Sequence, residues 1–206
     1  MILVLPVVVA VCVSLLQGGS LSHLRMLPIR GTWAIVSSFV IQAAMYVVGD
    51  SYPAFVRQTG AGIYIPAMVL VMYGVLRNWR LGAAARLVLL GLSLNLAVIA
   101  ANGGRMPVDT GLLRATEGAA QVRALELSEP AYYNREAVTA GSRLTFLSDE
   151  IEVPFPLGHG YVCSIGDIVL AVGAGLLSFK ATRRPWPQNQ AESPAPSAQV
   201  VLRLPA

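Results

Sequence analysis

The chain has 206 residues, of which 55% are hydrophobic and only 13% are charged. Soluble domains carry about 25% charged residues, and the mean hydropathy of this chain is +0.61. These values exclude an ordinary soluble protein and predict a single domain embedded in a membrane. The formal net charge is +4, but no basic run interleaved with aromatic residues is present. We therefore expect the basic residues to orient the chain in the lipid bilayer, and we expect no nucleic-acid partner.

Five apolar blocks approach the roughly 20 residues that a helix needs to cross a bilayer. They predict transmembrane spans at about 2–18, 32–49, 60–76, 81–101 and 165–180. Pro66 predicts a kink in the third span. The first block has no positive side chain before it and no small-residue cleavage site after it, which favours a retained span over a cleaved signal peptide. The expected fold is an all-α membrane protein, a bundle of about five transmembrane helices in a membrane domain at 1–180.

Basic residues mark one side of this predicted domain. They gather in the first and third connections and after the last block, at Arg25, Arg30, Arg77, Arg80, Lys180, Arg183 and Arg184. Because cytoplasmic flanks carry an excess of Lys and Arg, this alternation predicts an outside N-terminus and a cytoplasmic C-terminus in the inner (plasma) membrane. The connection 102–164 is then one long extracytoplasmic loop. The segment 181–206 is rich in Pro and Ala and is predicted to be a disordered cytoplasmic tail.

The first residues of the long loop predict how the fourth span ends. They are Asn102, Gly103, Gly104, Arg105, Met106 and Pro107. The asparagine and the two glycines can take positive φ and cap the helix. The arginine follows at the membrane surface, and the proline keeps the methionine before it out of helical conformation. Further along, Asp109 or Thr110 is expected to cap a short amphipathic helix at 111–127, lying on the bilayer or over the bundle.

Ser164 and Asp167 have the spacing of a capping box at the start of the last span. The carboxylate of Asp167 would then meet the positive end of that helix. An additional ion pair between Arg105 and Asp167 is the alternative, because both residues flank spans at the same face of the membrane. The spacing is compatible with the cap alone and with the cap plus the ion pair.

Two other groups of residues were considered as metal or redox sites. The acidic cluster Asp149, Glu150 and Glu152 has only His159 near it in sequence, so we expect a solvated acidic turn. Cys12 and Cys163 have no zinc-type spacing and are expected to be free thiols. We therefore predict no metal and no cofactor.

Three stretches of the chain resemble a known family: NGGRMPV, RLTFLSDEIEVP and SIGDIVLAVG. Together with the opening LLQGGSLSHL, they are similar to the uncharacterised bacterial membrane proteins of the DUF5317 (domain of unknown function) family. The resemblance covers roughly 1–180, and Ser148 departs from the family's commoner glycine. Beyond the loop residues already named, it includes Arg143, Leu144, Leu147, Asp149, Ser164, Gly166 and Asp167. It implies a bacterial membrane protein and brings no activity with it.

Three classes of function fit these observations. The first is a non-enzymatic accessory or scaffold component of a membrane complex, with the lipid bilayer and a membrane protein as partners. The second is a small transporter or ligand-binding membrane protein, in which Gln42, Pro66 and Asn95 shape a polar cavity. The third is a membrane enzyme whose acid–base groups converge at the extracytoplasmic face, the candidates being Arg105, Asp149, Glu150, His159 and Asp167. Because no complete catalytic set is present, we favour the first class and leave the catalytic residues unassigned.

Overall fold

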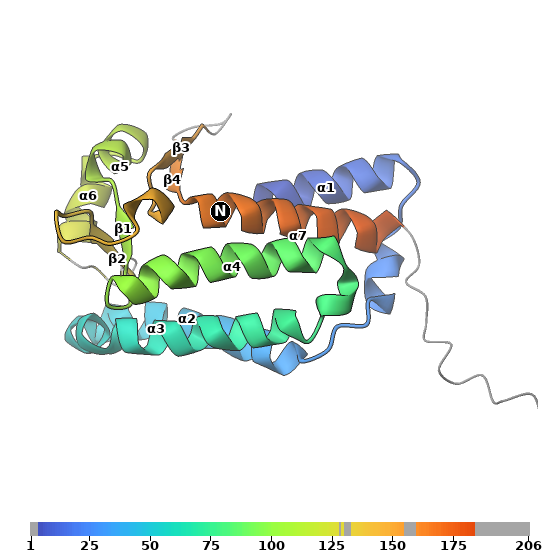
Figure 1. Ribbon diagram of the computed structural model, residues 1–206, viewed down its shortest axis with the longest axis horizontal. Coiled ribbons are helices and arrows are strands. Elements are labelled where there is room, and N and C mark those ends of the chain that lie inside the picture. The colour runs from blue at the N-terminus through green and yellow to red at the C-terminus, as the bar shows by residue number, and fades with distance from the viewer. Residues whose placement is uncertain (1–3, 128, 130–132, 155–159, 184–206) are drawn as a thin grey trace, which may run out of the picture.

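The computed structural model describes residues 4–127, 129, 133–154 and 160–183 (Figure 1). Five helices form an elongated bundle: α1 (Val4–Leu16), α2 (Thr32–Ser51), α3 (Pro53–Leu76), α4 (Ala83–Ala101) and α7 (Ile165–Arg183). They pack as a row in the order α1, α7, α4, α3, α2. The described part of the connection 102–164 folds over one end of this row, and we call it the cap. The two ends of the bundle are named the cap end and the tail end.

Four of the helices, α2, α3, α4 and α7, are long and apolar enough to cross a membrane. They fit a multi-pass membrane protein. Helix α1 is also apolar but has only 13 residues in the described part of the chain. The expectation of about five spans is therefore supported for four helices. The predicted spans otherwise agree with the helices to within a few residues, with one exception.

The third span was expected at 60–76, whereas α3 begins at Pro53 and continues through Pro66. Only Tyr52 separates it from the end of α2. Proline suits the first turn of a helix, where its missing N–H would be unpaired in any case. The interval 50–59 between the second and third predicted spans is therefore almost entirely helical, because a helix does not have to stop where the apolar sequence stops.

Helices α4 and α7 pack antiparallel with their backbones in close approach. A Cβ atom on Gly91 would lie 2.6 Å from the carbonyl oxygen of Gly166, and one on Gly173 would lie 2.6 Å from the backbone nitrogen of Val88. On another face of α7, a Cβ on Gly175 would lie 3.3 Å from the carbonyl oxygen of Pro6 in α1. Small residues thus let α7 fit between two neighbours, as is common between membrane helices.

The cap has a small β-structure and an apolar core of its own. Strand β1 (Met106–Val108) pairs in parallel with β2 (Arg135–Ala137), and Val108 forms an isolated bridge with Asp149. Strands β3 (Ile151–Val153) and β4 (Tyr161–Cys163) pair antiparallel, and β4 leads directly into α7. The core of the cap consists of Val108, Leu113, Val122, Leu125 and Val162.

The stretch that was expected to be one amphipathic helix at 111–127 contains two. Helix α5 (Thr110–Thr116) and α6 (Ala119–Glu126) are separated at Gly118, whose φ is 105°. This backbone conformation suits glycine and interrupts an α-helix. The buried residues of both helices, among them Leu113 and Val122, face the core of the cap.

Candidate functional site at the junction of cap and bundle

The residues that were predicted to end the fourth span do so. Asn102 is the C-cap of α4, and Gly103 and Gly104 have φ of 67° and 96°. Gly104 also passes close to α3, because a Cβ there would lie 2.6 Å from the Cβ of Ala61. After this turn, Met106 and its two neighbours in β1 are buried. The chain therefore leaves the membrane helix and enters the middle of the cap at once.

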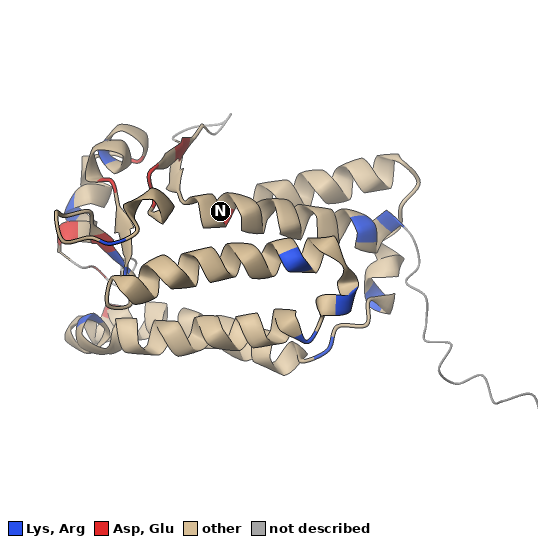
Figure 2. Ribbon diagram, in the orientation of Figure 1, with Lys and Arg blue, Asp and Glu red and all other residues tan. Residues whose placement is uncertain are grey.

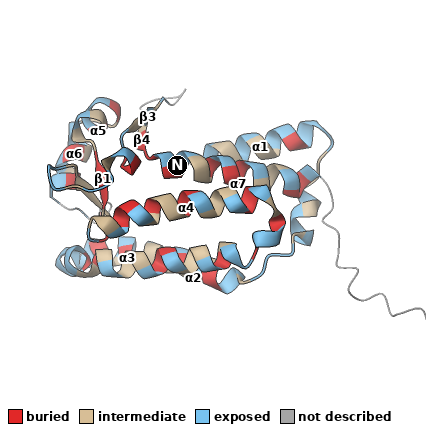
Figure 3. Cartoon of the chain, viewed as in Figure 1, coloured by how far each residue is buried: buried red, intermediate tan, exposed pale blue. Residues whose placement is uncertain are grey.

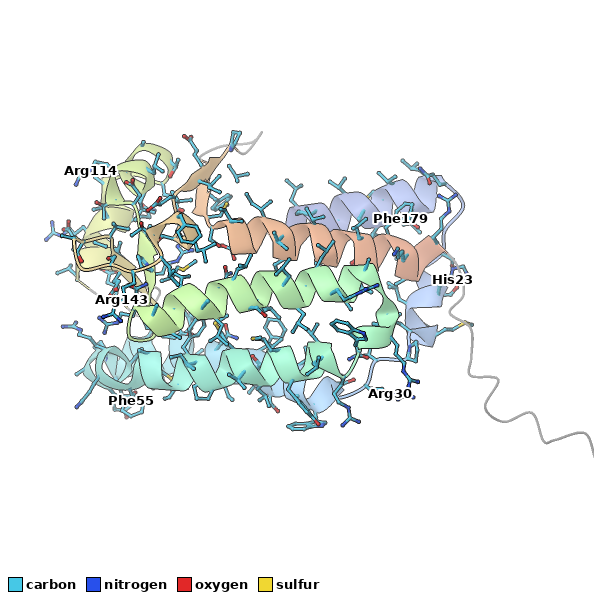
Figure 4. All side chains as sticks on the ribbon, viewed as in Figure 1. His23, Arg30, Phe55, Arg114, Arg143 and Phe179 are labelled. Atoms are coloured by element: carbon cyan, nitrogen blue, oxygen red, sulfur yellow. The ribbon has the colours of Figure 1, made fainter. Side chains whose placement is uncertain are left out.

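Asn102 joins the end of α4 to a distant part of the cap. Its Nδ2 donates to the carbonyl oxygens of Val98 and Arg143, both at 2.8 Å. Its Oδ1 accepts a hydrogen bond from the backbone N–H of Arg143, also at 2.8 Å. Figure 4 shows Arg143 at the cap end of the bundle. Asn102 and Arg143, which lie in separate sequence motifs, are thus joined by two hydrogen bonds.

Asp149 is a buried residue rather than part of a solvated turn. Its side chain is 2% exposed, and its Oδ2 lies 3.2 Å from Nη2 of Arg135. Its backbone N–H donates to the carbonyl oxygen of Pro107, and its own carbonyl oxygen accepts from the N–H of Asp109. This pairing with β1 turns the carboxylate inward. The expectation of a solvated turn was wrong for Asp149, although Glu150 and Glu152 are exposed.

Burial raises the pKa of the Asp149 carboxyl to about 7. The positive charge of Arg135 opposes this rise in pKa, whereas the negative charges of Asp167 and Glu117 add to it. The Oδ1 atom of Asp149 is buried and has no hydrogen-bond partner. This carboxyl can therefore take up or release a proton near neutral pH, and it can accept one further hydrogen bond. Groups with such properties are often found at functional sites.

A second polar cluster joins α4 to the start of α7. Ser164 and Asp167 form the predicted capping box: Asp167 N–H donates to Ser164 Oγ at 3.0 Å, and Ser164 N–H donates to Asp167 Oδ2 at 3.4 Å. Asn95 completes the cluster, because its Nδ2 donates to Asp167 Oδ1 at 2.7 Å and its Oδ1 accepts from Ser164 Oγ at 2.9 Å. The capping-box prediction is confirmed, and Asn95 packs between helices.

The alternative ion pair between Arg105 and Asp167 is not formed. Nη2 of Arg105 instead donates to the carbonyl oxygen of Arg57 in α3, at 3.1 Å. Asp167 is occupied by its contacts with Asn95 and Ser164. In the part of the chain that the structure describes, the ion pair joins Asp149 to Arg135. Arg135 was not predicted as the partner of Asp149, because nothing in its local sequence distinguishes it from a surface residue.

Apolar contacts also hold the cap on the bundle. Tyr133 is buried against Met45 and Val56, and its ring meets that of Tyr64 edge-on at 5.9 Å. Burial, with a smaller effect of Tyr64, raises the pKa of the Tyr133 hydroxyl to about 12. Elsewhere the buried residues Met106 and Leu147 of the cap pack against Met68, Val98 and Ile99 of α3 and α4.

Of the five residues considered for an enzyme, the four that the structure describes do not form one acid–base set. Arg105 is turned towards the backbone of α3, and Glu150 is exposed. His159 lies outside the described residues. Asp149 and Asp167 influence each other electrostatically but hydrogen-bond to different partners. Within the described ranges, no three His, Cys, Asp or Glu side chains are grouped as metal ligands.

The profile of a family of unknown function, DUF5317, matches residues 26–179. The chain belongs to the DUF5317 family. The matched region of this DUF5317 protein includes helices α2 to α6, the whole cap and most of α7, and thus both polar clusters. No curated protein and no solved structure matches the chain. The cysteines of the DUF5317 protein are both free, Cys12 exposed and Cys163 buried, as expected.

Proposed function

We propose that this DUF5317 protein is a non-enzymatic component of a membrane assembly, in which the capped bundle serves as a binding element for another membrane protein. The observation that carries this proposal is that polar side chains within the spans form hydrogen bonds with other residues of the helices. Ser38 donates to the carbonyl oxygen of Ala67, Gln42 donates to Ser38, and Asn95 bonds within the α4–α7 cluster. Such hydrogen bonds are typical of polar groups that stabilise helix packing, which supports this proposal over a polar path for a substrate.

The two ends of the helix row support a role in assembly. Helices α1 and α2 each have one neighbour in the row, and Figure 3 shows exposed residues along α1. The exposed side chains of α2 include Trp33, Val36, Phe39, Val40, Tyr46 and Val47. A helix with such a face can pack against lipid or against a further membrane helix. We propose that a partner helix occupies the free side of α2.

The charge distribution supports an orientation in the membrane. For the described ranges, Figure 2 shows basic residues without acidic ones at the tail end, whereas acidic and basic residues occur together near the cap end. Among the described residues, the basic ones at the tail end include Arg30, Arg77, Arg80 and Lys180. The positive-inside rule then favours a cytoplasmic tail end and a cap outside the cytoplasm, with the N-terminus on the cap side. We propose this orientation in the inner (plasma) membrane of a bacterium.

The assembly proposal can be tested with the tagged chain, extracted gently from its native membrane into lipid nanodiscs. We expect the chain to purify with a stable partner in a fixed ratio. The variants Val40→Trp and Val47→Trp on the free face of α2 should lose that partner. Leu90→Trp, at a similarly exposed position of α4, should retain it. A monodisperse single-chain particle from native membranes would contradict the proposal, as would equal partner binding by all three variants.

A ligand-binding role is the second candidate, and the free Oδ1 atom of Asp149 favours it. A buried carboxylate with an unused oxygen can bind a cation or a hydrogen-bond donor. The test is thermal unfolding of the purified protein with sodium, potassium, magnesium, calcium or spermidine. Stabilisation by one of these cations that is lost in Asp149→Asn would support this role. Equal effects on the wild type and the variant would contradict it.

A further inference from the structure

Two large apolar side chains of the cap are exposed although the cap has an apolar core. Leu144 is 40% exposed and Phe146 is 66% exposed. They flank the start of the short 3-10 helix η4 (Thr145–Leu147). Leu144 also has a φ of 53°, in the left-handed region that a branched apolar residue rarely adopts. Burial within the chain does not explain why apolar residues occupy these positions.

The depth of η4 along the bundle suggests an explanation. Its last residue, Leu147, packs in one cluster with Val98 and Ile99 of α4. These residues come three and two positions before the end of α4 at Ala101. With a rise of about 1.5 Å per residue, they lie about 3–5 Å inside the end of the span. Helix η4 therefore lies beside the last turn of α4 rather than above it.

We propose that this segment dips into the bilayer, and that Leu144 and Phe146 insert among the lipids of the leaflet at the cap end. The exposed apolar residues Ile165 and Ile168 in the first turn of α7 belong to the same end of the bundle, so the lipid-facing surface extends to this level. Tyr52 and Phe55, at the turn between α2 and α3, are also exposed at the cap end. Aromatic residues are enriched at this depth of membrane proteins.

The backbone of the segment is anchored to the end of α4. Non-helical backbone is tolerated at membrane depth where it is buried against protein, so only the side chains of the segment should enter the lipid. Asn102 pairs both the N–H and the carbonyl oxygen of Arg143. The carbonyl oxygens of Leu144 and Thr145 accept from the N–H groups of Leu147 and Ser148, at 2.9 and 2.8 Å. The entry into the segment is thus held against the end of α4, and part of its backbone is hydrogen-bonded.

A test compares two labelled positions in the purified full chain, reconstituted in phosphatidylcholine vesicles. Cys12→Ala removes the exposed thiol, and Phe146→Cys or the control Ala140→Cys, at an exposed position of the same loop, receives an environment-sensitive fluorophore. We expect a blue-shifted emission at position 146 and quenching by shallow spin-labelled lipids, at least about twofold stronger than at position 140. An aqueous quencher should show the reverse order.

The opposite outcomes overturn the proposal. If iodide quenches both labels equally in the vesicles, the segment lies in water. If position 146 is protected in native membranes but accessible in vesicles of the purified chain, a protein partner covers it instead of lipid. A label at Leu144→Cys repeats the measurement at the second exposed apolar position, so a perturbed Phe146→Cys variant does not decide the result alone. This experiment is independent of whether the chain has a partner at α2.

Discussion

The side-chain amide of Asn102 makes two hydrogen bonds with the backbone of Arg143, one as donor and one as acceptor. The same arrangement occurs at the opposite end of the bundle. There, Asn78 accepts a hydrogen bond from the N–H of Arg30 at 2.8 Å and donates to the carbonyl oxygen of Arg30 at 2.7 Å. In both cases an asparagine at the end of a membrane helix holds a distant loop against the bundle.

Replacing Asn102 should loosen the cap and leave the tail end intact. Asn102→Ala removes three hydrogen bonds, and we expect a loss of about 1–3 kcal/mol in the free energy of unfolding. Asn102→Asp keeps the acceptor but places a carboxylate oxygen against the carbonyl oxygens of Val98 and Arg143, so its effect should be at least as large. The measurement is denaturant unfolding in detergent together with the rate of proteolysis in the loop 139–146.

Asn78→Ala is the matched control for this prediction. It should destabilise the chain by a similar amount without accelerating proteolysis of the cap loop. Because the two asparagines lie at opposite ends of the bundle, the effects of the two alanine substitutions on stability should add. Strong non-additivity, or faster cap proteolysis in Asn78→Ala, would show that the two junctions are not separate.

The stability of the protein should depend on the protonation of Asp149. The pKa of this carboxyl is raised from 3.8 to about 7 in the folded chain, so the folded state binds the proton more tightly than the unfolded state. The resulting stability is fully present below about pH 4 and is lost as the pH rises through about 7. Its size is on the order of a few kcal/mol. The unfolding temperature should therefore fall between pH 5 and pH 8.

Asp149→Asn should remove most of this pH dependence, because asparagine keeps the shape without the charge. The released Arg135 is partly exposed and can be solvated. Glu150→Gln is the control at an exposed neighbouring position and should behave as the wild type. The prediction fails if the unfolding temperatures of the wild type and Asp149→Asn fall in parallel over the same pH range.

The sequence predicted those features that depend on local patterns. The apolar blocks indicated the helices, Asn102 with its glycines indicated the end of α4, and the Ser164–Asp167 spacing indicated the start of α7. The pairing of Asn102 with Arg143 joins residues 41 positions apart, and that of Ser164 with Asn95 joins residues 69 positions apart. Such contacts leave no periodic signal in a single sequence. The two ends of the cap were therefore predictable, but the contacts that dock it were not.

Asp149 illustrates why the site was misjudged. Its neighbours Glu150 and Glu152 are exposed, and three acids close together usually indicate a solvated turn. The decisive factor is the backbone pairing of Asp149 with Pro107 and Asp109, which directs one acid of the three inward. The position of β1 in the folded cap determines that Asp149, rather than Glu150 or Glu152, is the buried acid.

The close approach of α4 and α7 should make Gly91 intolerant of any side chain. A Cβ there would meet backbone atoms of Gly166 and Leu170 at 2.6 Å, and backbone atoms cannot move without separating the helices. We expect Gly91→Ala to cost at least about 2 kcal/mol in the free energy of unfolding. Gly62→Ala is the control: this glycine lies in α3 with open space around its Cβ position. It should be neutral or stabilising by up to about 1 kcal/mol.

The hydrogen bond between Ser164 and Asn95 should couple the start of α7 to α4. Ser164→Ala removes this bond and also the hydrogen bond from the N–H of Asp167 to Ser164 Oγ at the start of α7. Asn95→Ala removes the bonds to Ser164 and Asp167. In a double-mutant cycle the shared bond is lost only once, so the double variant should be less destabilised than the sum of the two single variants. Hydrogen bonds between membrane helices are worth about 0.6 kcal/mol on average and up to about 1.7. A coupling energy in this range is expected from unfolding measurements, and a value near zero would mean that the two residues stabilise their helices independently.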